Sequence, residues 1–178
     1  MVVKHAIVYR LAVITAVLLT AACASVPLAD KESDAAGKRF DPPPSGLAKL
    51  YVYQSACSPS SVRPMGTVYV VDQGSCGTNS VYLRMDSQQD RNVGQLGPGN
   101  WLSIDVTPGD YDIWCEQGAT SARTQKLELK SGEQAFVALV RLKEDDFLGF
   151  KGYGCIPRKV GPQAGMVAVK ERQRARTP

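Results

Sequence analysis

Histidine is almost absent from this chain of 178 residues, in which His5 is the only one. Because His5 lies within the first ten residues, removal of the N-terminal segment would leave a mature protein without any imidazole. Ser-His-Asp catalysis, Cys-His catalysis and zinc sites with histidine ligands would then be excluded. The remaining candidate groups are carboxylates, Lys, Tyr, Ser and Cys, and no G-x-S-x-G or paired-carboxylate pattern brings them together. We therefore expect a protein that is not an enzyme.

Long apolar runs are also missing. The run at 11–22 (LAVITAVLLTAA) is shorter than the about 20 residues that a membrane-spanning helix needs. Lys4 and Arg10 precede it, which is typical of a secretory signal peptide over residues 1–22. The charge balance is weak as well, with 21 basic against 17 acidic residues and a net charge of +4. Since nucleic-acid-binding proteins usually carry a concentrated basic stripe, we expect export and no nucleic-acid partner.

Two cleavage sites are compatible with the end of this segment. The string ACA at 22–24 fits a general signal-peptidase site, with a soluble periplasmic product released after Ala24. The string TAAC at 20–23 is similar to the lipoprotein box, in which Cys23 becomes the lipidated first residue, although Thr20 replaces the usual Leu. We favour lipidation, and the similarity implies that Ala24 after the cysteine directs export to the outer membrane. Several acyl chains on Cys23 would anchor the protein firmly.

Cysteines are few, and once Cys23 is set aside four of them remain: Cys57, Cys76, Cys115 and Cys155. An even number of cysteines in an exported protein indicates disulfides, and four of them allow three pairings. We favour Cys57–Cys76, because both residues lie in turn-like sequence beside neighbouring strands. The pair Cys115–Cys155 then follows by elimination.

The exported part divides into three regions. Residues 23–46 are polar, charged and end in three prolines, which predicts a flexible linker that would hold the domain about 25 Å from its anchor. Residues 47–170 have the size of one domain. Residues 171–178 are predicted as a basic tail, either disordered or in contact with anionic lipid or peptidoglycan. Basic side chains alternate from the last residue of the domain into this tail: Lys170, Arg172, Arg174 and Arg176.

Strand signals dominate the central region, whereas sustained helical periodicity is absent. In the first strand, alternation places Leu50 and Val52 on one face and Tyr51 and Tyr53 on the other. We predict a single, all-β, sandwich-like domain of about eight or nine short strands. A hairpin is predicted between the two segments that flank Ser131-Gly132. The predicted strands are 47–54, 66–72 (as a central strand), 80–85, 92–96, 101–106, 111–116, 126–130, 133–142 and 164–170.

Three strings resemble a family of bacterial envelope lipoproteins that is classed only as a domain of unknown function. They are GLAKLYVYQ behind the KRFDPPPSG linker, GQLGPGNWLSIDVTPGDYDI and LELKSGEQAFVALV. The resemblance covers residues 40–170 and rests on turns and strand faces. It implies a β-sandwich-like domain behind a lipoprotein signal and brings no catalytic residues. The chain departs from the family pattern by an insertion around Cys57 to Cys76.

The candidate binding residues are aromatic. Trp101 and Trp114 alternate with the aliphatic residues of their strands, so they either share an exposed binding face or are covered by other elements. Phe147, Phe150 and Tyr153 are interleaved with glycines in a segment predicted as a loop. This loop could stack on a sugar or pack on a peptide, or it could cap one end of the core.

Metal and cofactor sites are not expected. Glu144, Asp145 and Asp146 are consecutive carboxylates without the D-x-D-x-D-G spacing of a cation loop. The leading hypothesis is a non-enzymatic, outer-membrane-anchored lipoprotein that faces the periplasm and acts as an interaction or structural module. Its partner would be an envelope protein or a glycan. The alternative is a lipoprotein that binds a small ligand, glycan or peptide through the 147–154 loop.

Overall fold

The computed structural model describes most of the chain after the predicted signal segment. Side chains are not described for 62–65, 68–71, 141–145 and 151–154. Residues 1–25, which include Cys23, lie outside the described part, and so do Cys57, Cys76, Phe147 and Phe150. The described residues are 26–54, 62–65, 68–71, 77–85, 88–116, 124–145 and 151–177.

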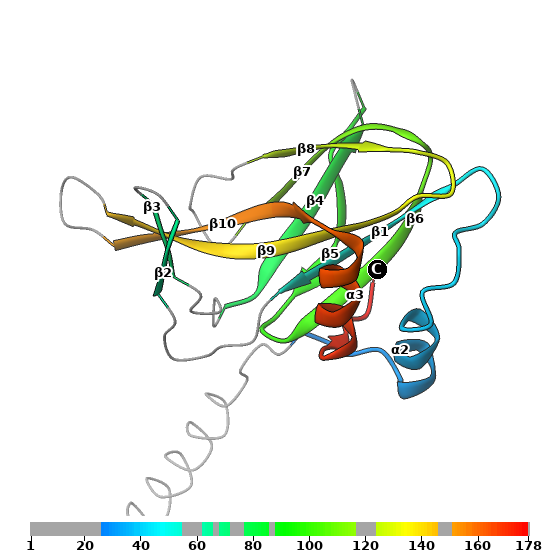
Figure 1. Ribbon diagram of the computed structural model, residues 1–178, viewed down its shortest axis with the longest axis horizontal. Helices are drawn as coiled ribbons and strands as arrows, with labels where there is room; N and C mark the ends of the chain where they lie inside the picture. The colour runs from blue at the N-terminus through cyan, green and yellow to red at the C-terminus, as the bar shows by residue number, and fades with distance from the viewer. Residues whose placement is uncertain are drawn as a thin grey trace, which may run out of the picture.

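Two β-sheets form the body of the molecule (Figure 1). The five-stranded sheet has the order β10 (Lys151–Val160), β9 (Gln134–Asp145), β1 (Ala48–Gln54), β6 (Asn100–Val106) and β11 (Gln173–Arg174). The four-stranded sheet has the order β5 (Arg91–Leu96), β4 (Asn79–Met85), β7 (Gly109–Glu116) and β8 (Gln125–Leu129). The prediction of an all-β, sandwich-like domain is confirmed.

The core lies between the two sheets and follows the predicted alternation. Leu50 and Val52 of β1 and Leu102 of β6 face it from the first sheet. Val81 of β4 and Ile113 of β7 face it from the second. All five side chains are fully buried. Burial of such a side chain contributes about 1.5–3 kcal/mol, so this layer is the main source of stability.

Tight turns carry the chain from one sheet to the other. The turn around Gly132, where φ is +79°, joins β8 of the four-stranded sheet to β9 of the five-stranded sheet. The predicted hairpin at this point is therefore wrong: β8 pairs with β7, and β9 pairs with β1 in parallel and with β10. The β5–β6 and β6–β7 connections change sheets in the same way.

Two other strand predictions need correction. The segment predicted as a central strand, 66–72, contains β3 (Val68–Val71), which pairs with β2 (Val62–Met65) in a separate two-stranded sheet. The segment 164–170, predicted as a closing strand, is instead part of helix α3 (Pro162–Lys170). Pro162 pre-sets the first helical turn, and the buried Gly165 and Val169 lie four residues apart on the face turned to the sheet.

The predicted linker is folded from residue 26 onward, so its description as flexible is wrong there. Helix α2 (Lys31–Gly37) is capped at its N-terminus by Asp30, whose carboxylate accepts a hydrogen bond from the Ser33 N–H at 2.7 Å. After the helix, the Phe40 ring packs 5.4 Å from the Tyr51 ring. Gln134 Nε2 also donates to the Phe40 carbonyl at 2.8 Å. These contacts compensate the cost of ordering a polar segment.

The basic tail is also folded as far as the structure describes it. β11 pairs in parallel with β6, and the Ala175 N–H donates to the Trp101 carbonyl at 2.7 Å. Helices α2 and α3 and this C-terminal segment lie on the side of the five-stranded sheet that faces away from β7 and β8 (Figure 1). That sheet is therefore covered on both faces. Neither of the two described helices is long and apolar enough to cross a bilayer.

Candidate functional site

The two tryptophans do not form a shared binding face. Trp101 lies on β6 of the five-stranded sheet and is fully buried, whereas Trp114 lies on β7 of the four-stranded sheet and is 9% exposed. Of the other predicted aromatics, Tyr153 lies in strand β10 rather than in a loop. Its side chain, like Phe147 and Phe150, lies outside the described part.

Trp101 belongs to an aromatic layer on the outer face of the five-stranded sheet. Tyr51 and Phe136 stack with their ring centroids 4.8 Å apart, and the Trp101 ring lies 6.0 Å from Tyr51. Cations of the C-terminal segment lie over this layer, with Arg172 4.9 Å from the Tyr53 ring and Arg174 5.3 Å from the Trp101 ring. These basic residues therefore stabilise the fold through cation–π contacts.

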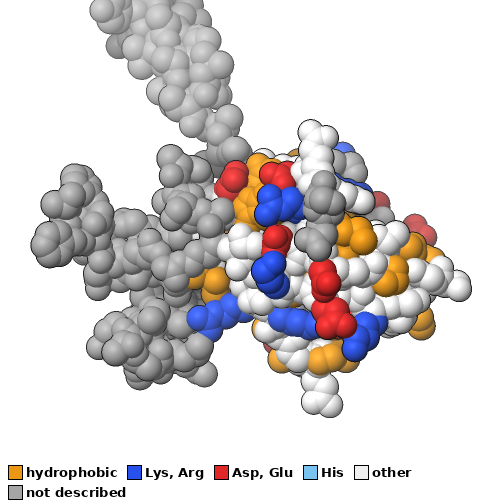
Figure 2. All heavy atoms as spheres, turned by 90° about the horizontal axis from the view of Figure 1, so that it is seen from above, with side chains coloured by type: hydrophobic (Ala, Val, Ile, Leu, Met, Phe, Trp, Pro, Cys, Tyr) orange, Lys and Arg blue, Asp and Glu red, His pale blue; other side chains and the backbone are white. Residues whose placement is uncertain are grey.

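The outer face of the four-stranded sheet carries interleaved charges. Arg84 of β4, Asp112 of β7 and Lys126 of β8 form a row, with N–O distances of 3.3 Å and 3.5 Å to the two Asp112 oxygens. Trp114 stacks on Tyr82 at 5.4 Å beside this row. Seen from the side of β7 and β8, blue and red side chains alternate over the surface (Figure 2). Paired charges of both signs favour the solubility of this face, and they do not create a field of one sign that would attract a partner of opposite charge.

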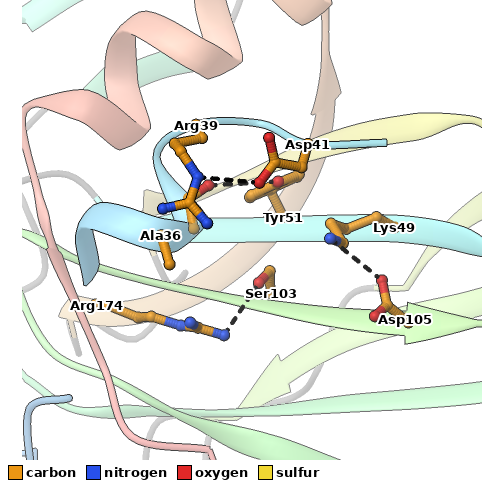
Figure 3. Close-up of a pocket in the computed structure, with 9 residues that line it drawn as sticks. Ala36, Arg39, Asp41, Lys49, Tyr51, Ser103, Asp105 and Arg174 are labelled. Atoms are coloured by element: carbon orange, nitrogen blue, oxygen red, sulfur yellow. Dashed lines mark hydrogen bonds and ion pairs between the residues drawn. The ribbon is translucent and has the colours of Figure 1, made fainter. Parts of the chain in front are cut away.

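A polar cleft of about 250 Å³ opens on the covered side of the five-stranded sheet. Two cross-strand pairs of β1 and β6 form its floor: Lys49 lies opposite Asp105, and Tyr51 opposite Ser103. The two-residue period of a strand brings Lys49 and Tyr51 to the same outer face. Lys49 Nζ lies 3.7 Å from Asp105 Oδ1. Figure 3 shows this pair at one end of the cleft.

The walls of this outer-face cleft come from segments far apart in the sequence. On one side Arg39 Nε lies 3.1 Å from Asp41 Oδ2, just after α2. On the other side the Arg174 guanidinium of β11 donates to Ser103 Oγ at 3.4 Å and to the Ser33 carbonyl at 3.0 Å (Figure 3). The cleft therefore presents ammonium, guanidinium, phenol and hydroxyl donors next to two carboxylates.

Tyr51 keeps its proton throughout the physiological range. Burial, together with the negative charges of Asp105 and Asp41, raises the pKa of Tyr51 to about 12 against the opposing effect of Arg174. The Tyr51 hydroxyl donates to the Gly37 carbonyl at a long 3.5 Å. The cleft thus contains a neutral phenol rather than a phenolate.

One of the two predicted disulfides is confirmed. Cys115 of β7 and Cys155 of β10 form a disulfide that links the two sheets, as expected. The pair Cys57–Cys76 lies outside the described residues. Glu144 and Asp145 lie in β9, and Asp146 is not described. Within the described part of the chain, no three Cys, His, Asp or Glu side chains lie close enough to hold a metal ion.

The two ends of the described chain are joined by backbone hydrogen bonds, which we call the terminal clasp (residues 26–29 and 174–176). The Ala29 N–H donates to the Arg174 carbonyl at 2.9 Å, and the Arg176 N–H donates to the Pro27 carbonyl at 2.8 Å. Leu28 forms an antiparallel bridge with Ala175. Val26 is buried against the sandwich core.

Sequence reasoning placed Tyr51 on the outer face of its strand but predicted neither the cleft nor the clasp. Alternation along β1 and β6 already separates Tyr51 and Ser103 from the core residues. Arg39 and Arg174 belong to the segments predicted as linker and tail. Their approach depends on long-range packing, for which the sequence has no periodic signal. Comparison with known proteins adds no relative, since no family model and no curated protein matches the chain.

Proposed function

We propose that this chain is a non-enzymatic lipoprotein of the bacterial envelope, anchored to the outer membrane through Cys23 and facing the periplasm. Its folded domain would act as an interaction or structural module. The signal-like N-terminus and the lipoprotein-box string support the anchor. The observation that carries the proposal is the terminal clasp, because the backbone that follows Cys23 enters the fold at Val26 and pairs with the C-terminal segment.

The clasp would connect the proposed lipid anchor directly to the folded domain. Val26 packs into the core and residues 27–29 bond to a segment that pairs with β6. A lipid on Cys23 would therefore limit the height of the sandwich above the bilayer and restrict its orientations. A restricted orientation is useful for a module that presents one surface to other components of the envelope, because less orientational freedom is lost when a partner binds.

Crosslinking in whole cells tests this function. The tagged wild-type protein and a Cys23→Ser variant are crosslinked, membranes are separated, and bound components are identified by mass spectrometry. We expect wild-type protein in the outer-membrane fraction together with a reproducible envelope protein or glycan. The Cys23→Ser variant should be missing from the outer-membrane fraction, and the partner should no longer be crosslinked to it. Recovery of wild-type protein without any specific envelope component would contradict an interaction role.

Ligand binding is a second candidate function, and the outer-face cleft favours it. The cleft is lined by Arg174 and Lys49 together with Asp105 and Asp41, so it matches a small molecule that carries both a carboxylate and an ammonium, such as a short peptide. The ligand-binding alternative expected from the sequence used the 147–154 loop. Residues 151–154 of that loop belong to β10, and 147–150 lie outside the described part.

An NMR titration with alanyl-alanine, and with acetate as a single-charge probe, tests the cleft. We expect the dipeptide to shift the Arg174 side-chain N–H and the Ser103 amide, and Asp105→Asn to weaken the effect. Asp110→Asn, an exposed position of β7 in the four-stranded sheet, is the matched control and should behave as the wild type. Absence of any shift at millimolar dipeptide would reject this second function.

A further inference from the structure

One end of the sandwich combines the terminal clasp with the edge strand β5. A hollow of about 320 Å³ there is lined by the first and last described residues together with β5. Leu28, next to this hollow in the chain, is 44% exposed, and large exposed apolar side chains are otherwise rare in the described part. We call this surface the clasp face and define it by six residues. They are Val26, Pro27, Leu28, Asn92, Gln95 and Arg176.

Chain length restricts where this face can lie if Cys23 carries the lipid. Three Cα–Cα steps separate Cys23 from Val26. At about 3.8 Å per step they span at most about 11 Å, less than half of the about 25 Å that a flexible linker over residues 23–46 would span. Val26 is only 8% exposed and packs with the core, so the segment cannot peel away without exposing apolar surface. The clasp face must therefore lie close to the level of the acylated cysteine.

The chemistry of the clasp face suits lipid headgroups. Leu28 and Pro27 are exposed and can enter the boundary between headgroups and acyl chains. The exposed Arg176 can reach phosphate oxygens with its guanidinium while its aliphatic part lies along apolar surface. Asn92 and Gln95 offer amide groups for hydrogen bonding. Among the described residues that line the hollow there is no Asp or Glu side chain to repel a phosphate.

We propose that the clasp face is a membrane-docking surface on which the sandwich rests against phospholipid headgroups, so that the domain sits on the bilayer instead of swinging from a flexible tether. This inference rests on the proposed lipidation of Cys23.

Photo-crosslinking to lipid tests the docking surface in the full-length protein. A photoreactive phenylalanine analogue is placed at Leu28, at Arg176 or, as the control, at Glu128, an exposed residue of β8 in the other sheet. After irradiation of cells, lipid adducts are measured by mass spectrometry of the purified protein. We expect a several-fold higher yield of phospholipid adducts from the first two positions than from Glu128. Both positions are exposed, so the analogue should not disturb the fold.

A spacer variant provides the matched test of chain length. Insertion of about ten Gly and Ser residues after Ser25 adds a reach of roughly 15–20 Å. It should reduce the adducts at Leu28 toward the level of Glu128 while the acylation of Cys23 persists. Equal adduct yields at Leu28 and Glu128 in acylated wild-type protein would overturn the docking inference alone. Absence of acylation would overturn the proposed function and the docking inference together.

Discussion

Trp101 connects three parts of the chain that are distant in the sequence. Its indole Nε1 donates to Asp34 Oδ1 of α2 at 3.0 Å, and its ring lies under Arg174 of β11. Gly37 allows this approach, because a Cβ at that position would meet the Trp101 ring at 2.3 Å. A single side chain therefore holds both terminal segments against the sheet.

Replacement of Trp101 should be among the most destabilising substitutions. Trp101→Ala removes a fully buried aromatic side chain, and we expect the free energy of unfolding to fall by about 3–5 kcal/mol. Trp101→Phe keeps an aromatic ring but loses the Nε1 donor, so its cost should be smaller. Denaturant unfolding of both variants measures the difference. A loss below about 1 kcal/mol for Trp101→Ala would contradict the described packing.

Asp34 should make part of the stability dependent on acid. Burial alone would raise its pKa, but hydrogen bonds from Lys38, the Arg174 N–H and Trp101 outweigh burial and lower the pKa below the ordinary 3.8. A group whose pKa is lowered by folding stabilises the fold at pH values above its pKa in the unfolded state. This contribution is lost as the pH falls through the pKa of the folded state. We expect Asp34→Asn to be less stable than the wild type at neutral pH, and the difference to shrink below about pH 4. An equal difference at all pH values would contradict this account.

Helix α3 depends on a close approach to the sheet. A Cβ at Gly165 would meet the Phe136 side chain at 2.3 Å, close to the backbone of β9, where little movement is possible. Alanine forms helices better than glycine by about 1 kcal/mol, so propensity alone predicts that Gly165→Ala stabilises the helix. Steric overlap between the added Cβ and Phe136 should make this substitution destabilising instead.

Thermal unfolding distinguishes these two effects. We expect Gly165→Ala to lower the Tm, because α3 must move away from the aromatic layer. Gly161→Ala, just before the helix and with open space at its Cβ position, is the control and should change the Tm little. A Tm for Gly165→Ala at or above that of the wild type would show that α3 does not pack as described.

The Cys115–Cys155 disulfide ties the two sheets together across 40 residues of chain. Closing a loop of this length restricts the unfolded state by about 4 kcal/mol in the chain-entropy description. We expect the Cys115→Ala, Cys155→Ala double variant to lose about 2–4 kcal/mol of unfolding free energy. Comparison with the wild type under non-reducing conditions measures the loss, and equal stabilities would contradict a structural role.

Sequence periodicity predicts the strands but not their partners. Alternation identified β1, β4, β6, β7 and the start of β9 within one or two residues, because one face of each packs on the core. It missed β10, whose N-terminal half is rich in glycine. It also gave the wrong element at 164–170, where valines favour a strand and packing on Phe136 favours a helix. Which sheet each strand joins depends on contacts between distant residues.

The whole molecule is arranged around its terminal clasp. The predicted linker and tail, which composition alone describes as flexible, fold together over the outer face of the five-stranded sheet and form the walls of the cleft. Their order depends on mutual contacts that neither segment possesses alone. In a domain built in this way, the segment at residues 26–29 is held in place relative to the five-stranded sheet.

The intact mass of the mature protein, purified from the membrane fraction, tests the central claim most directly. The account predicts a chain that begins at Cys23 and carries the mass of a diacylglyceryl group and a further acyl chain. It also predicts that Cys23→Ser lacks this addition. An unmodified chain that begins at Ser25 would contradict lipid anchoring and with it the proposed place of the protein on the membrane.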